Sequence, residues 1–367
     1  MRILFIAPLP PPLTGQSLAS RILYEFLIIS NKLVLVDQRK KSFKEGIDSF
    51  FRIFEILKLL FNVTFKFQSC DVIYLTVSES ISGNIKDLCI YSICYFRLKN
   101  VVIHLHGGTI RRELWNENRL LFKINSYFLK RIGGIIITGK SHQKIYDDFI
   151  NPDRIHIIPN FAQDYLFVDE GVIYDKFLLQ NNKVKILYIS NMIPKKGYMQ
   201  LLSAFLTLDE SIKNHITIDF AGGFDSELAE VEFLNKICDQ HRITYHGVVN
   251  GFKKEKLFRD AHIFCLPTTY LEGQPISILE AYASGCVIMT TGQPGILDIF
   301  EHKKNGFQIL PNSQSIASTI VKIIAKKSKL FEIGLENNRQ ARLIYRTQKY
   351  STAVEKVLGK FARKNSQ

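Results

Sequence analysis

Short apolar runs alternate along the chain with longer segments in which apolar residues recur every three or four positions. The short runs are typical of strands buried on both faces of a parallel sheet, and the longer segments have the period of helices that cover such a sheet. The alternation loses its period over 161–182 and restarts at Val184, and a length of 367 residues suggests two domains or one large one. The expected strands are Ile3–Ala7, Leu33–Val36, Val72–Leu75, Val101–Leu105, Gly134–Thr138, Ile155–Ile158, Lys185–Ile189, Ile216–Phe220, Ile243–His246, Ile263–Leu266 and Cys286–Met289.

One expected helix, 43–67, is unusually apolar. Its apolar residues leave only a narrow polar stripe at Asp48, Arg52, Glu55 and Asn62, with further lysines and arginines around it. It is either an interfacial helix that meets anionic lipid or a mostly buried helix packed on the N-terminal sheet, and we favour the buried helix. The other expected helices are Ser17–Ile29, Ile85–Leu98, His142–Phe149, Met199–Leu206, Phe252–Ala261, Ile276–Ala283, 314–327 and about 331–363.

The stretch 262–291 contains a complete βαβ unit, because a polar loop and a helix separate its two apolar runs. Pro275 stands at the first helical position and Gly285 follows the last one, as expected at helix ends. Glu272 lies in the loop and Glu280 lies in the helix. Ligands of open α/β sheets bind beyond the carboxyl ends of strands, so these carboxylates are placed to accept hydrogen bonds from sugar hydroxyls.

Composition and charge narrow the classes of partner. The 367 residues are 46% hydrophobic and carry a formal net charge of +14, so a folded chain with an anionic partner is expected. The basic residues are spread along the sequence without an aromatic-interleaved motif, which argues against nucleic acid. The six cysteines form no C-x-x-C pair and stand mostly in apolar runs, as free thiols do in a reducing compartment.

No apolar run reaches the roughly 18 residues that span a bilayer, and the first run is too short for a signal peptide. We therefore expect a cytoplasmic protein, with peripheral association at the inner face of the cytoplasmic membrane as an open alternative.

The sequence EGQPISILEAYASG, with seven residues between Glu272 and Glu280, resembles the donor-site motif of the retaining glycosyltransferases of family 4. The resemblance covers nearly all of 1–365 and is sharpest over 184–310. It implies the GT-B fold, in which two Rossmann-like doubly wound parallel-sheet domains face each other across a cleft. On this basis we expect an acceptor-binding domain over 1–165, a linker over 166–183, a nucleotide-sugar domain over 184–340, and a C-terminal helix over 341–367 that returns to the N-terminal domain.

The resemblance implies a donor site in the C-terminal half. Glu280 would accept hydrogen bonds from ribose, Glu272 would hold the donor sugar, and Lys196 would neutralise the diphosphate. Asn191 stands where the family usually has an arginine, so one fixed cation is replaced by a neutral side chain. The remaining expected donor residues are Lys195 beside Lys196, Gly273 and Gln274 near the phosphates, Gly247 and Val248 at the base, and Gly15 in the loop after the first strand.

The acceptor half carries fewer candidates. His106 follows an expected strand and precedes two glycines, and the resemblance directs it toward the transferred sugar. Glu272, His106 and Lys196 are therefore the expected catalytic residues. Arg111 and Arg112 could meet an anionic acceptor, although an ordinary solvated face is equally consistent with their sequence.

The expected reaction needs no cofactor and no metal. The chain contains no Asp-x-Asp, the motif with which another glycosyltransferase fold holds a metal on the diphosphate. Cations and backbone N–H groups would then stabilise the leaving group. The resemblance implies transfer of a hexose or N-acetylhexosamine from a nucleotide sugar, with UDP as the expected nucleotide, by front-face substitution with retained configuration. The expected acceptor is a saccharide, lipid-linked through undecaprenyl diphosphate, in bacterial surface polysaccharide synthesis.

Two other classes of function stay open. A sugar-nucleotide epimerase of the same fold would release product without an acceptor, although the setting of the two glutamates argues against it. A non-catalytic nucleotide-sugar-binding subunit would bind the donor without turnover, and Asn191 is the residue that favours this alternative.

Overall fold

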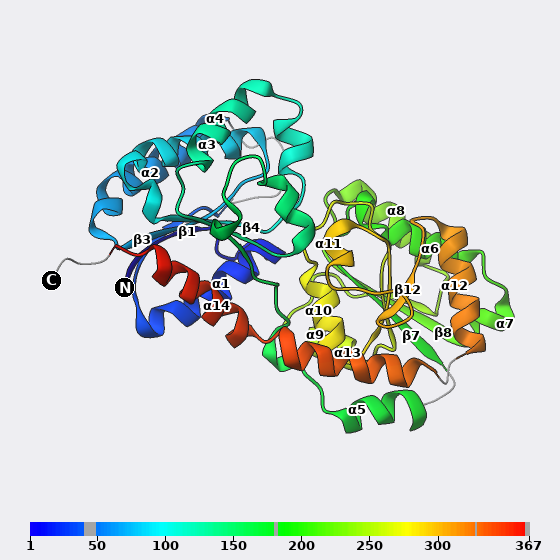
Figure 1. Ribbon diagram of the computed structural model, residues 1–367. Coiled ribbons are helices and arrows are strands. Elements are labelled where there is room, and N and C mark those ends of the chain that lie inside the picture. The colour runs from blue at the N-terminus through cyan, green and yellow to red at the C-terminus, as the bar shows by residue number, and fades with distance from the viewer. Residues whose placement is uncertain (40–48, 180–182, 327–328, 364–367) are drawn as a thin grey trace. The chain divides into compact units, whose positions relative to one another are not determined.

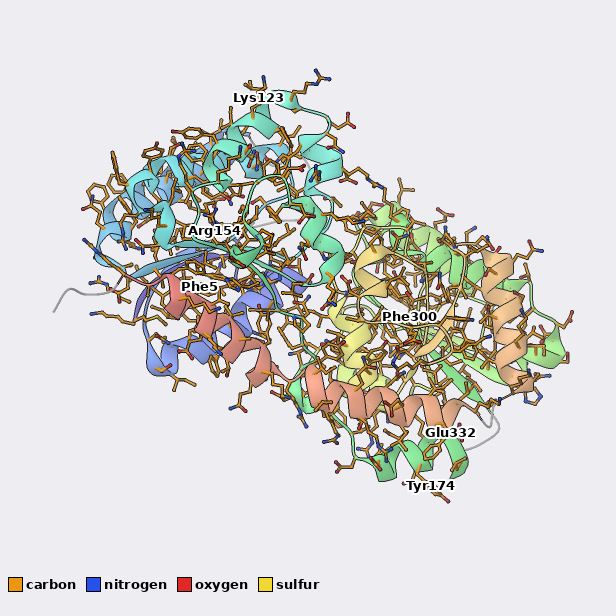
Figure 2. The ribbon with its side chains drawn as sticks, viewed as in Figure 1. Phe5, Lys123, Arg154, Tyr174, Phe300 and Glu332 are labelled. Carbon is orange, nitrogen blue, oxygen red and sulfur yellow. The ribbon has the colours of Figure 1, made fainter. Side chains whose placement is uncertain are left out.

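The computed structural model describes residues 1–39, 49–179, 183–326 and 329–363 (Figure 1). They form two compact units. Unit 1 comprises Met1–Asn160, Leu271–Gln274 and Gln348–Gln367, and unit 2 comprises Phe161–Tyr270 and Pro275–Thr347. Residues 40–48 lie outside the described residues, and they include 43–48, the start of the expected helix at 43–67. In each unit, side chains fill the space between sheet and helices, and Phe5 in unit 1 and Phe300 in unit 2 are both buried (Figure 2).

Unit 1 is built on a six-stranded parallel sheet. All six strands were expected, because fully buried parallel strands are apolar on both faces. Their residues fill one continuous core together with the helices that cover them. In spatial order the strands are β2 (Lys32–Asp37), β1 (Arg2–Ala7), β3 (Val72–Thr76), β4 (Val101–Leu105), β5 (Gly134–Ile137) and β6 (Ile155–Ile157).

The strand order places the helices of unit 1 on both faces of the sheet, since right-handed crossovers in opposite directions put their helices on opposite sides. One face carries α2 (Ser49–Lys66), α3 (Ile81–Ile93) and α4 (Arg119–Leu129), which pack side by side. The other carries α1 (Gly15–Ser30) and the distant α14 (Thr347–Phe361), which Figure 1 shows next to each other. Ser30 at the end of α1 donates a hydrogen bond to Glu355 of α14 at 3.0 Å.

Unit 2 repeats the architecture with a second six-stranded parallel sheet. Its order is β12 (Gly306–Gln308), β11 (Val287–Thr290), β10 (Ile263–Leu266), β7 (Val184–Ile189), β8 (Ile216–Ala221) and β9 (Ile243–Tyr245). The expected class, two Rossmann-like doubly wound parallel sheets, is therefore confirmed. The principal helices are α6 (Tyr198–Leu206), α8 (Glu227–Ile237), α9 (Gly251–Asp260), α10 (Ile276–Ala283), α12 (Ser313–Ala325) and α13 (Leu330–Ile344).

The segment without clear period contains two short helices that belong to unit 2. They are α5 (Glu170–Tyr174) and the π-helix η7 (Asp175–Leu179). Ile173 and Phe177 point into the core of unit 2, and the buried Lys176 donates a 2.7 Å hydrogen bond to the carbonyl of Ser284 at the end of α10. Apolar residues are too few here to show a period, yet tertiary contacts hold the segment in place.

Three helix predictions need correction. The expected helix His142–Phe149 is wrong, because 140–145 is a 3₁₀ turn whose carbonyls at Lys144 and Ile145 accept hydrogen bonds from Arg111. The expected helix Ile85–Leu98 ends at Ile93 and gives way to a 3₁₀ segment, η2 (Tyr95–Asn100). The expected single helix over 331–363 is two helices, α13 and α14, because the carbonyl of Tyr345 accepts from the N–H of Ala162 at the break.

Helix α2 also differs from its prediction. Leu59 and Val63 pack into the core of unit 1, but five large apolar side chains of the same helix are exposed. The interpretation as a mostly buried helix is therefore wrong for the part of α2 that the structure describes. No helix within the described residues is long and apolar enough to cross a membrane.

Candidate active site

The central site of unit 2 lies where its strand order reverses. Strands β7 and β10 are neighbours, and their outgoing connections run to opposite sides, so the loops that follow them share one edge of the sheet. The carbonyl oxygen of Lys195 joins the two loops, because it accepts hydrogen bonds from the N–H groups of Thr269 at 2.7 Å and Tyr270 at 3.2 Å. The sequence predicted both loops but gave no sign of this backbone link.

Lys196 lies in the loop after β7, with its ammonium 5.0 Å from the centre of the Tyr270 ring. Gly197 follows in the left-handed conformation, with φ of 84°. A Cβ at this position would overlap the carbonyl oxygen of Pro267, so glycine lets the two loops approach closely. Lys195 and Asn191 are exposed in the same loop, and the carbonyl of Asn191 accepts from the hydroxyl of Tyr188 at 3.3 Å.

The expected base-binding residues follow β9, next to the loop that follows β8. The carbonyl of Gly247 accepts from the N–H of Gly222 at 2.9 Å, which ties these two loops together. Gly247 has φ of 66°, and Val248 is 69% exposed. Backbone groups and an exposed aliphatic side chain are therefore available at this edge of unit 2.

Glu280 is buried in α10 and forms an ion pair with Lys254 of α9, with 2.6 Å between Oε1 and Nζ. The same ammonium donates to Gln163 at 3.2 Å. Burial raises the pKa of the Glu280 carboxyl, and Lys254 opposes that rise. Lys254 is a partner that the sequence did not reveal, since it stands among several other charged residues in one helix.

The short segment Leu271–Gln274 belongs to unit 1. The side chain of Gln274 accepts from the N–H of Asn160 at 3.0 Å, and its carbonyl accepts from the Asn160 side chain at 2.8 Å. Gly273 lies against the carbonyl oxygen of His106, where a Cβ would overlap it, and the carbonyl of Glu272 lies against Gly108. The structure thus brings Glu272, Gly273 and Gln274 together with His106 in unit 1.

His106 follows β4, and its ring stacks on that of His104 with 4.0 Å between the ring centres. The ring of His104 is held by Tyr74, because Nδ1 of His104 lies 2.8 Å from the hydroxyl of Tyr74. Both ring nitrogens of His106 are buried without a hydrogen-bond partner among the described residues, and burial lowers the pKa of His106 to about 4. A neutral imidazole with unused hydrogen-bonding groups is suited to a polar ligand, such as a sugar hydroxyl.

Glu79 supports the turn that follows His106. Its carboxylate accepts from the N–H groups of Thr109 at 2.7 Å and Ile110 at 3.1 Å. A Cβ on Gly107 would overlap this carboxylate, so a larger residue there would displace it. Burial raises the pKa of Glu79, and the two backbone hydrogen bonds oppose that rise. No motif in the sequence singled out this residue.

The three remaining candidates, Gly15, Arg111 and Arg112, belong to other segments of unit 1. Gly15 is the first residue of α1, whose N-cap Thr14 accepts from the N–H of Ser17 at 3.1 Å. Arg111 forms an ion pair with Asp148 within unit 1, whereas Arg112 is more exposed and lies 3.3 Å from Glu113. Within the described ranges, no group of three or more His, Cys, Asp or Glu side chains is arranged to hold a metal ion.

Comparisons with known proteins place this geometry in a class. The whole chain resembles GT-B structures, including that of HepE from Anabaena in complex with UDP, with a TM-score of 0.76, 16% identity, and 98% of this chain and 100% of that chain covered. WaaG, described as a glycosyltransferase involved in lipopolysaccharide biosynthesis, matches with a TM-score of 0.67, 12% identity and coverage of 97% and 98%. The GT-B fold is thereby established.

The family comparison concerns slightly less than half of the chain. Residues 172–349 match the family described as "Glycosyl transferases group 1". An uncharacterized glycosyltransferase of Methanocaldococcus jannaschii is 27% identical over 204 residues, which are 52% of this chain and 50% of that protein. The alignment therefore spans about half the length of this curated relative.

Proposed function

We propose that the protein is a retaining glycosyltransferase that moves a hexose or N-acetylhexosamine from a nucleotide sugar to a saccharide acceptor. The observation that carries the proposal is the buried Glu280–Lys254 pair between α10 and α9, within the segment that matches the group 1 family. A buried carboxylate with a fixed cation is a pre-organised acceptor for ribose hydroxyls. Because the similar Anabaena protein was solved with UDP and with UDP-glucose, we propose UDP as the nucleotide.

The proposed reaction is a direct transfer. The acceptor hydroxyl oxygen bonds to the anomeric carbon, the bond from that carbon to the diphosphate breaks on the same face, and the leaving diphosphate takes the acceptor proton. Lys196, with Lys195 beside it and the N–H groups of Gly273 and Gln274, would stabilise the growing negative charge, so the step requires no metal. Glu272 and the neutral His106 would hold hydroxyls of the transferred sugar.

The proposal also includes the kind of acceptor and the pathway. The resemblance to WaaG and the high positive charge support a lipid-linked acceptor in bacterial surface polysaccharide synthesis, used at the inner face of the cytoplasmic membrane. The acceptor would then present phosphate groups and a saccharide to unit 1.

Thermal unfolding with UDP, GDP, dTDP, ADP and their sugars tests the donor site. A ligand present at 100 times its Kd stabilises the native state by about 2.7 kcal/mol. We expect UDP and a UDP-sugar to raise the unfolding temperature of the wild type, and Glu280→Gln to remove most of that shift.

Two results would count against this proposal. Stabilisation of the wild type by none of the nucleotides would remove the donor site. Transfer to a saccharide acceptor with inverted configuration at the anomeric carbon would remove the retaining mechanism.

A further inference from the structure

The exposed side of helix α2 is largely apolar, and three of its polar residues are half-buried. Five side chains are between 54% and 70% exposed: Ile53, Phe54, Leu57, Phe61 and Phe65. The polar residues Glu55, Asn62 and Lys66 are half-buried instead. A helix at the surface of a soluble domain normally shows the opposite arrangement. We call these five exposed residues the apolar row.

The apolar row is continuous along the helix. Ile53, Leu57, Phe61 and Phe65 recur every four residues and therefore lie on one side, with Phe54 next to them. At 1.5 Å per residue the row is about 18 Å long. The rings of Phe61 and Phe65 are in contact, with 4.5 Å between their centres.

A further exposed apolar side chain belongs to a segment that contacts the C-terminal end of α2. Arg97 of η2 donates hydrogen bonds to the carbonyls of Phe67 and Gln68, which follow α2 directly. The neighbouring Phe96 is 97% exposed. An apolar surface of this extent on a folded unit indicates an interaction site rather than scattered apolar residues.

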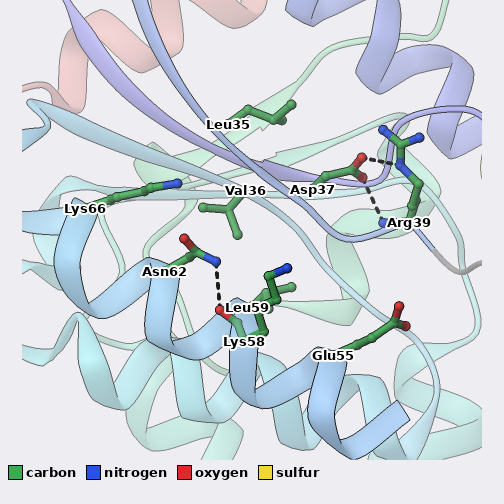
Figure 3. A pocket seen from close by; sticks show the side chains of 9 residues that line it. All are labelled: Leu35, Val36, Asp37, Arg39, Glu55, Lys58, Leu59, Asn62 and Lys66. Carbon is green, nitrogen blue, oxygen red and sulfur yellow. Dashed lines mark hydrogen bonds and ion pairs between the residues drawn. The ribbon is translucent and has the colours of Figure 1, made fainter. Parts of the chain in front are cut away.

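A polar cavity of about 260 Å³ lies beside the same helix, between α2 and β2 (Figure 3). Its basic residues are Arg39, Lys58 and Lys66, and its acidic residues are Asp37 and Glu55. Arg39 is paired with Asp37, while Lys58 and Lys66 form no ion pair with a described residue. The two lysines therefore have unneutralised charge beside the apolar row.

We propose that α2 docks unit 1 on a membrane that contains anionic lipid. The apolar row enters the boundary between headgroups and acyl chains, and Lys58 and Lys66 meet lipid phosphates at the polar cavity. The charge of the helix fits this occupant, because α2 contains Arg52, Lys58 and Lys66 but only one acidic residue, Glu55. The apolar row itself contains no charged residue, as insertion requires.

This inference goes beyond the proposed transferase reaction and does not depend on it, because membrane binding needs neither donor nor acceptor. A protein partner would also cover an apolar row. Lys58 and Lys66, which line the cavity beside the apolar row, favour the membrane, because its anionic surface attracts basic residues.

Co-sedimentation of the full chain with vesicles tests the proposal. The vesicles contain either phosphatidylcholine alone or 70% phosphatidylcholine and 30% phosphatidylglycerol. We expect binding to the anionic vesicles that weakens as salt rises. Phe54→Ser, Phe61→Ser and Phe65→Ser combined should lower the partition coefficient at least tenfold, and Lys58→Gln with Lys66→Gln should lower it several-fold.

The matched control is a chain with Leu228→Ser, Val231→Ser and Phe252→Ser, which removes three exposed apolar side chains from unit 2. It should bind anionic vesicles as the wild type does. All variants are first compared with the wild type by thermal unfolding, since exposed substitutions should leave the fold intact.

Three outcomes would overturn the proposal. In the first, the wild type does not bind anionic vesicles. In the second, the serine variant of α2 binds them as tightly as the wild type does. In the third, the wild type self-associates without binding vesicles and the α2 variant alone is monomeric, which would make a second copy of the chain the occupant.

Discussion

At the scale of single residues, two candidate site residues each have a structural partner that the sequence did not predict. Glu280 was predicted from its motif, but the buried Lys254 that compensates its charge was not. His106 was predicted from its place before two glycines, but Glu79, which holds the following turn, was not. Partners of this kind come from elements distant in sequence, so a local pattern has no information about them.

The ion pair gives a direct prediction. Lys254→Met should lower the free energy of unfolding by about 3 kcal/mol, because it leaves the Glu280 carboxylate buried without its cation. It should also raise the pKa of Glu280 further. Chemical denaturation at pH 7 measures the first effect. The second effect is measured by UDP binding as a function of pH, because the loss of binding on acidification should begin at a higher pH in the variant than in the wild type.

Two further chains control this experiment. Lys256→Met removes an exposed lysine of the same helix and should cost little stability. Lys254→Met combined with Glu280→Gln should recover part of the loss, since no charge is then buried. If the single and the double variant were equally unstable, the pairing would not be the cause.

At the scale of elements, eleven of the twelve strands in the described residues could be predicted, but β12 and the orientation of a helix could not. Parallel strands buried on both faces are apolar throughout, so their sequences identify them. For α2 the same reasoning located a helix, but periodicity alone does not say which side faces the core. The 140–145 turn was missed for a related reason, because its carbonyls bond to Arg111 rather than along a helix.

The turn after β4 is an element whose stability can be tested. Glu79→Ala should lower the free energy of unfolding by about 2 kcal/mol, because the buried N–H groups of Thr109 and Ile110 lose their acceptor. Glu79→Gln keeps one acceptor oxygen and should cost less. Hydrogen exchange should speed up at Thr109 and Ile110 in the alanine variant.

The exposed Glu113→Ala is the control for this turn, and its exchange rates at 109–110 should equal those of the wild type. Unchanged protection in Glu79→Ala would mean that the turn is held by other contacts.

At the scale of the whole molecule, each unit is built from distant parts of the chain. Unit 1 contains the first 160 residues, four residues from the loop after β10, and the last helix. In α14, Tyr350, Val354 and Leu358 are buried. Its C-terminal Phe361 lies against Gly133 and Gly134 and accepts a 2.9 Å hydrogen bond from Asn100.

Removal of α14 should therefore unfold unit 1. A chain that ends at residue 346 loses three large buried side chains, each contributing about 2 kcal/mol, against a typical total stability of about 5–15 kcal/mol. We expect loss of the cooperative transition of unit 1 in thermal unfolding, with unit 2 still folded. A chain that ends at residue 363 is the control, and cooperative unfolding of both chains would show that α14 is dispensable.

The same division of unit 1 constrains how its specificity can be exchanged. If residues 1–160 recognise the acceptor, a single crossover between two related genes would transfer them without α14. The product would combine the sheet of unit 1 from one parent with α14 from the other parent. The glycines and buried side chains of that sheet would then not match the side chains of α14. Chimeras that are meant to change the acceptor should therefore carry residues 1–160 and 348–363 from the same parent.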